Sequence, residues 1–85
     1  MTQPSLEKIH IVIRKKDGIV WQGDVDSFSS INEIGPFDIL PEHSHFVGLV
    51  EQYVIIRQAK NEKKWDIEHG ILSVKDGIIE VYLGY

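Results

Sequence analysis

Turn-forming residues divide this chain into short segments that lack the pattern of a long helix. Asp17-Gly18, Gly35-Pro36, Pro41 and Asp76-Gly77 are spread along its 85 residues, and proline or glycine at such positions interrupts regular backbone structure. No segment between them shows the sustained period of 3.6 residues, with capping residues, that a helix of about ten or more residues needs. The chain is therefore predicted to be all-β.

Short β-type runs occupy the spaces between the turns. Ile9, Ile11 and Ile13 fall on one face of the run over residues 6–14, and this period of two is typical of a half-buried strand. Asp76-Gly77 lies between two apolar runs, which is the strongest short-range hairpin signal in the chain.

Several segments predict strands with local irregularities. Residues 46–58 have enough periodicity for some helix, but Gly48 and a run of β-branched residues favour strands. The apolar residues of 25–31 are three apart, and the serines between them favour a bulge over a helical turn. Residues 60–63 are predicted as a hairpin tip, and Gly70 as an interruption of the strand that follows.

The length and the number of runs together predict the architecture. A chain of 85 residues forms one domain with one thin core. The runs correspond to about eight to ten short strands, whose apolar faces must be buried against another layer. Residues 1–85 are therefore predicted to form a single flattened two-sheet β-sandwich or barrel without a long helix.

Composition excludes several classes of function. The formal net charge is −4 and there is no cysteine, so disulfides and thiolate metal sites are excluded. The basic residues are scattered, so no nucleic-acid partner is expected. No apolar run approaches the roughly 20 residues that span a bilayer, and the first five residues lack the features of a signal peptide. A soluble, cytoplasmic protein without direct membrane insertion is predicted.

The cluster most suggestive of chemistry is Glu42-His43-Ser44-His45. In a strand, His43 and His45 project on the same side, and with Glu51 they are candidate metal ligands. The arrangement faintly resembles the metal motif of cupins, but Glu51 is too distant and His69 lacks the expected glycine and asparagine context. The alternative is a pair of loop-end histidines without a metal. No catalytic residues and no cofactor are predicted, since the sequence contains neither a G-x-S-x-G elbow nor a phosphate-binding glycine loop.

Three segments resemble one family in their order and spacing. They are residues 23–28 (GDVDSF), 35–43 (GPFDILPEH) and 69–81 (HGILSVKDGIIEV), and they look like the N-terminal β-sandwich domain of the epsilon subunit of F-type ATP synthase. The family usually has glycine where this chain has Asp38, Glu42 and His69, so the sequence resembles a divergent member.

The resemblance implies a function without catalysis. The epsilon domain belongs to the rotating central stalk, packs beside the gamma subunit and contacts the c-ring, so that ion flow is coupled to ATP synthesis. The c-ring-facing loop would be residues 35–43, with contacts from Gly35, Pro36, Phe37, Asp38 and His43. Trp65 and Tyr82 are expected to contribute to a gamma-facing sheet surface. The chain would be peripheral on the inner face of the membrane.

The family usually continues into a C-terminal helical hairpin that can inhibit ATP hydrolysis. This sequence ends at Tyr85, just after the last predicted strand, so neither that inhibition nor ATP sensing by such an arm is expected. Two alternatives remain open. One is a small cupin-like barrel that binds metal through His43, His45 and Glu51, and the other is an orphan β-sandwich module for protein–protein interaction.

Overall fold

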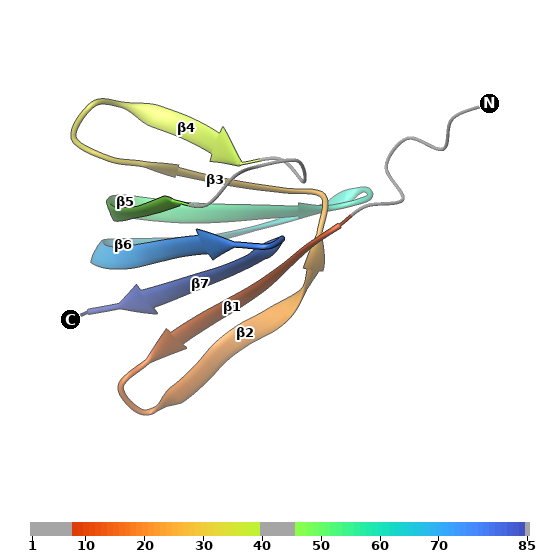
Figure 1. The fold of residues 1–85 in the computed structure, drawn as a ribbon, viewed down its shortest axis with the longest axis horizontal. Coiled ribbons are helices and arrows are strands. Elements are labelled where there is room, and N and C mark those ends of the chain that lie inside the picture. The colour runs from red at the N-terminus through yellow and green to blue at the C-terminus, as the bar shows by residue number, and fades with distance from the viewer. Residues whose placement is uncertain (1–7, 40–45, 85) are drawn as a thin grey trace.

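The computed structural model describes residues 8–39 and 46–84, with only the backbone of Phe46. These residues form strands and no helix (Figure 1), which confirms the all-β prediction. The strands are β1 (Ile9–Lys15), β2 (Gly18–Val25), β3 (Ser27–Ile31), β4 (Pro36–Ile39), β5 (Phe46–Gln58), β6 (Asn61–Lys75) and β7 (Ile78–Leu83).

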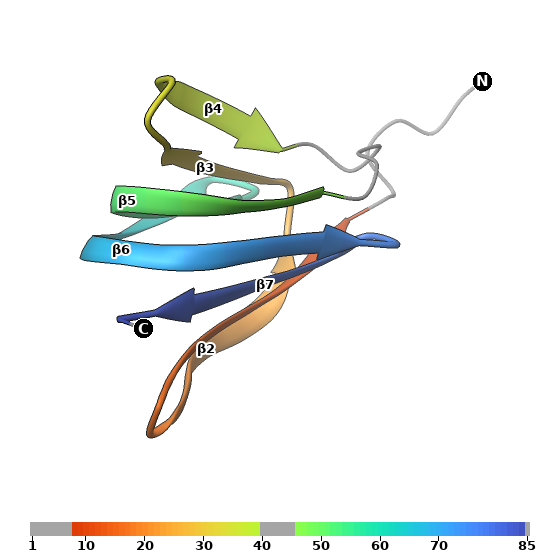
Figure 2. The ribbon, with the colours of Figure 1, turned by 60° about the vertical axis from the view of Figure 1, so that its left-hand side comes forward.

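One continuous hydrogen-bonded sheet joins the seven described strands in the order β2-β1-β7-β6-β5-β3-β4. Neighbouring strands are antiparallel except β1 and β7, which pair in parallel. In Figure 2, β6 starts behind β5, bends, and returns in front beside β7, so the sheet curls over itself. A register shift at Glu51/Gln52 marks the bend in β5. The two layers of a flattened sandwich are therefore made from a single bent sheet.

The core lies between these layers. Alternate residues of each strand point inward, as the period of two predicts, and they form one buried apolar cluster that includes Ile9, Ile11, Ile13, Phe28, Leu72 and Val81. Trp21 of β2 and Trp65 of β6 pack against the cluster with ring centroids 6.0 Å apart. This tilted aromatic pair joins the first layer to the second.

The predicted hairpins are confirmed in part. Asp76 and Gly77 have φ values of 52° and 78°, as a two-residue type I′ turn requires. The hairpin between β5 and β6 turns at residues 59–60 rather than 60–63, with Ala59 at φ 50°. The bulge predicted within residues 25–31 is wrong: Asp26 separates β2 from β3 there, and the register shift opposite Ser30 and Ile31 has its extra residues in β5.

Seven strands are described where about eight to ten were expected, because β5 and β6 run on without a break. The prediction that Gly70 interrupts its strand is wrong. Gly70 is buried inside β6, and a Cβ atom there would lie 2.6 Å from the carbonyl oxygen of Tyr82 on β7. Glycine is needed at this position because β7 approaches closely, which a sequence pattern cannot distinguish from a strand end.

Candidate protein-binding surface

One outer surface of the sandwich is apolar. It belongs to the layer of β1, β2, β7 and the adjoining halves of β5 and β6, and its central residues are Val47, Leu49, Ile71 and Tyr82, which we call the apolar face. Leu49 is paired with Ile71, and Ile71 with Tyr82, so three of these side chains lie in one row across the strands. Val47 is 72% exposed, Leu49 60% and Tyr82 43%. Such a contiguous exposed group is typical of a binding site for another protein.

Charged side chains border the apolar face. The guanidinium of Arg14 lies 5.4 Å from the ring centroid of Tyr82, and its Nη2 atom is 3.7 Å from Oε2 of Glu80. Arginine and tyrosine are enriched among residues that dominate binding energy. The cation–π pair therefore holds an aromatic side chain in place at the margin of this surface.

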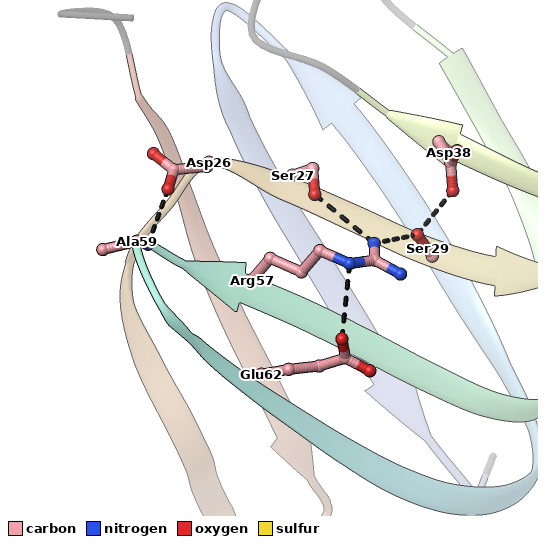
Figure 3. A network of polar contacts seen from close by, with 7 residues as sticks. All are labelled: Asp26, Ser27, Ser29, Asp38, Arg57, Ala59 and Glu62. Carbon is pink, nitrogen blue, oxygen red and sulfur yellow. Dashed lines mark hydrogen bonds and ion pairs between the residues drawn. The ribbon is translucent and has the colours of Figure 1, made fainter.

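The opposite outer surface carries polar side chains that form hydrogen bonds and an ion pair with one another (Figure 3). Arg57 of β5 donates from Nη1 to Oγ of Ser29 at 2.8 Å and to Oγ of Ser27 at 3.5 Å. Its Nε atom lies 3.5 Å from Oε1 of Glu62, and the Ser29 hydroxyl donates to Asp38 of β4. Ser27 and Ser29 are buried, so this network supplies the hydrogen bonds that buried hydroxyls require. The two outer surfaces thus differ in chemistry.

A polar corner connects the layers where β2 ends and β3 begins. The backbone N–H of Asp26 donates to the Arg57 carbonyl at 2.7 Å, and its carboxylate accepts from the Ala59 N–H at 2.7 Å and from Lys8. The Lys8 hydrogen bond, and then the Ala59 N–H, lower the pKa of the Asp26 carboxyl from its ordinary value of 3.8. Asp26 therefore fixes the crossing between the layers in its ionised form.

A groove opens at the end of the apolar face, between the turn that follows β3 and the first half of β5. Its volume is about 460 Å³, and its lining includes Ile34, Val47, Leu49, Glu33, Glu51 and His69. Ile34 is 93% exposed at the tip of the turn. The groove is thus continuous with the apolar face.

The predicted c-ring-facing residues are described only in part. Gly35 ends the turn after β3, and Pro36, Phe37 and Asp38 lie in the edge strand β4. Phe37 is half-buried against the core, whereas Pro36 and Asp38 are exposed. His43 lies outside the described residues.

The predicted gamma-facing residues lie apart from one another. Tyr82 is on the apolar face, whereas Trp65 is half-buried between the layers beside Trp21. Of the alternative metal ligands, His43 and His45 lie outside the described residues, and Glu51 is paired in the ladder with His69. Within residues 8–39 and 46–84, no group of three His, Cys, Asp or Glu side chains is placed to hold a metal ion.

The sequence did not indicate that Ile34, Val47 and Leu49 belong to a candidate binding surface. Their local pattern is that of any strand or turn residue, because an exposed apolar side chain and a buried one look alike in sequence. In a strand, successive side chains of residues 46–50 point to opposite faces, so the sequence places Val47 and Leu49 on the same face. It does not indicate which of the two faces is covered by another layer of the protein.

Sequence comparison finds related proteins at low identity. The ATP synthase epsilon chain of Leptospira borgpetersenii is 29% identical over 75 residues, which is 87% of this chain and 59% of that protein. The epsilon chain of Leptospira interrogans is 28% identical over 78 residues, 91% of this chain and 61% of that protein. This chain thus spans about three fifths of the length of the epsilon chains that it matches. No family model matches it.

Solved structures show the same fold. A chain of the Euglena gracilis mitochondrial ATP synthase (OSCP/F1/c-ring) superposes with a TM-score of 0.82 and 15% identity, covering 98% of this chain and 56% of that one. The chain is thus similar to ATP synthase epsilon chains in sequence and to ATP synthase chains in fold, and we call it the epsilon-like chain. A chain of the Tetrahymena thermophila ATP synthase central stalk and c-ring superposes with a TM-score of 0.77 at 11% identity. The superposition covers 93% of the epsilon-like chain and 65% of the Tetrahymena chain.

A third relative has a different name. The thymidylate kinase of Mycoplasma mobile is 32% identical over 90 residues, which is 96% of the epsilon-like chain but 42% of that protein. Nucleotide kinases of the P-loop type cradle phosphates with the motif G-x-x-x-x-G-K-[ST]. The epsilon-like sequence has glycines at this spacing in Gly18 and Gly23, but Asp24 stands where the lysine should be. The match therefore does not bring a phosphate-binding loop to this chain.

The described residues contain no helix able to cross a membrane.

Proposed function

We propose that the epsilon-like chain is a non-catalytic module of the central stalk of a rotary F-type ATP synthase. In this role it binds the gamma subunit and the c-ring, has no active site of its own, and contributes to coupling ion flow to ATP synthesis. It is peripheral on the inner face of the membrane through the complex. The observation that carries the proposal is the agreement of two comparisons, since epsilon-chain sequences and ATP synthase structures both match nearly the whole chain.

The contrast between the two outer surfaces supports a gamma-facing role for the apolar face. Tyr82, Val47 and Leu49 are exposed there, and aromatic and aliphatic side chains at the centre of an interface contribute most of its affinity. Trp65 is less suited to direct contact, because its ring is shared with the core. Residues 35–43 remain the proposed c-ring-facing segment, with His43 as a contact residue.

The experiment is a binding measurement with the gamma subunit and the c-ring of the same organism, each purified. Tyr82→Ala should weaken gamma binding about tenfold, as loss of a central aromatic residue does. Lys64→Ala, on the polar surface over the ring of Tyr53, is the matched control and should leave binding unchanged.

A functional assay completes the test. Proteoliposomes that contain the other ATP synthase subunits should regain ion-driven ATP synthesis when the epsilon-like chain is added. If this chain fails to bind gamma under conditions in which a standard epsilon subunit binds, the proposal is wrong.

A further inference from the structure

The groove beside the apolar face has a rigid wall. Asn32 and Gly35 exchange two backbone hydrogen bonds, each of 3.1 Å. The Oδ1 atom of Asn32 also accepts from the N–H groups of Ile34 at 2.9 Å and Gly35 at 3.2 Å. This side-chain-to-backbone pattern fixes a turn. Ile34 is therefore held at a defined position although its side chain is almost entirely exposed.

The floor of the groove is apolar. Val47 and Leu49 project into it from β5, where alternate side chains share one surface. Together with Ile34 they form three exposed aliphatic groups around a hollow of about 460 Å³. A pocket of this kind fits an apolar side chain supplied by a partner, because burying both surfaces removes apolar area from water.

Two carboxylates and one histidine lie at the rim of the groove. Several carboxylates elsewhere in the described residues pair with a cation, for example Asp26 with Lys8, Glu80 with Arg14, and Glu62 with Arg57. Glu33 and Glu51 both line the groove, and neither forms an ion pair with any residue in the described ranges. These carboxylates give the rim a negative potential that a cationic group of a partner would complement.

We propose that this groove binds an apolar side chain of the partner subunit that is followed closely by a lysine or arginine. The apolar side chain enters between Ile34 and Leu49, and the cation lies against Glu33 and Glu51. This inference rests on the proposed function, since the partner it specifies is the gamma subunit of the same stalk.

The test measures binding of the purified gamma subunit to the full chain and to three variants at several salt concentrations. Leu49→Ser should reduce the affinity about tenfold. The double variant Glu33→Gln/Glu51→Gln should reduce it about threefold to tenfold at low salt and flatten its salt dependence. Asp66→Asn, an exposed carboxylate on the opposite surface, is the control and should change neither quantity.

Thermal unfolding separates binding effects from folding effects. Leu49 is mainly exposed, so Leu49→Ser should unfold within a few degrees of the parent chain. If the parent chain binds gamma and the Leu49 and glutamate variants bind equally well, the groove inference is overturned and the stalk function stands. If the parent chain does not bind gamma at all, both are overturned. Self-association of the chain that is lost in Leu49→Ser would assign the groove to a second copy and would also overturn the inference.

Discussion

Replacing Gly70 by alanine tests the close approach of β6 and β7 directly. The added Cβ would lie 2.6 Å from the Tyr82 carbonyl oxygen and 3.3 Å from Cδ2 of Leu83. The oxygen belongs to a backbone that is held in the sheet by its pairing with β6, so the strands must separate locally. The effect is steric, since Gly70 is not among the glycines with positive φ.

The size of the effect follows from two opposing terms. Overpacking a tight interior costs about 1–3 kcal/mol. Restricting the unfolded chain by replacing glycine with alanine returns about 0.4–1 kcal/mol. A net loss of about 1–2 kcal/mol is expected, which for a domain of this length lowers the Tm by about 5–15 °C.

Urea and thermal unfolding followed by circular dichroism measure this loss. Gly23→Ala is the matched control, because its new Cβ would lie 2.9 Å from the tip of the Trp21 ring. A half-buried side chain can move where a backbone oxygen cannot, so Gly23→Ala should cost less than Gly70→Ala. A Gly70→Ala variant as stable as the parent chain would refute the reasoning.

Three further predictions concern polar contacts and backbone strain. Arg57→Ala should lower the free energy of unfolding by about 1–2 kcal/mol, because buried serine hydroxyls lose their donor. Glu62→Gln removes only an exposed ion pair and should cost under about 0.5 kcal/mol. Equal losses in urea unfolding would contradict the stabilising role of the arginine–serine hydrogen bonds. The pKa of the Asp26 carboxyl is lowered in the folded state, so its stabilising contribution is present above pH 3.8 and is lost as the pH falls through the folded-state pKa. Asp26→Asn should make the free energy of unfolding less sensitive to acid, which urea unfolding at a series of pH values below and above 3.8 will check. Gln52 has a φ of 72°, so Gln52→Gly should raise stability by about 0.5 kcal/mol, the relief of a left-handed conformation less the entropy of glycine; a loss in the same assay would show that no strain is stored there.

The fold was largely predictable because local periodicity reports which side chains share a surface. Ile9, Ile11 and Ile13 were assigned to one buried face, and all three are nearly inaccessible. The Asp76-Gly77 turn was likewise predictable, since it depends on residues adjacent in sequence. The long bent strands were not predictable from the sequence. The bend in β5 is stabilised by pairing with β3 along one edge and with β6 along the other, and both are distant segments of the chain.

The candidate surface was less predictable, because it depends on contacts between distant segments. Ser27 and Ser29 are buried on an outer surface only because Arg57, about 30 residues later, covers them. Tyr82 was expected in an interface on residue type alone. Val47 and Leu49 had no such signal, and only the arrangement of the layers shows that no described strand covers them.

The parallel pairing of β1 with β7 has a consequence for biosynthesis. The last strand lies in the middle of the sheet, between the first strand and β6. Until it has left the ribosome, β1 and β6 both present open edges, which are prone to pair with other chains. The domain must therefore complete its folding after translation of residue 83, and a nascent chain that stalls before Ile78 would be a substrate for chaperones rather than a folded domain.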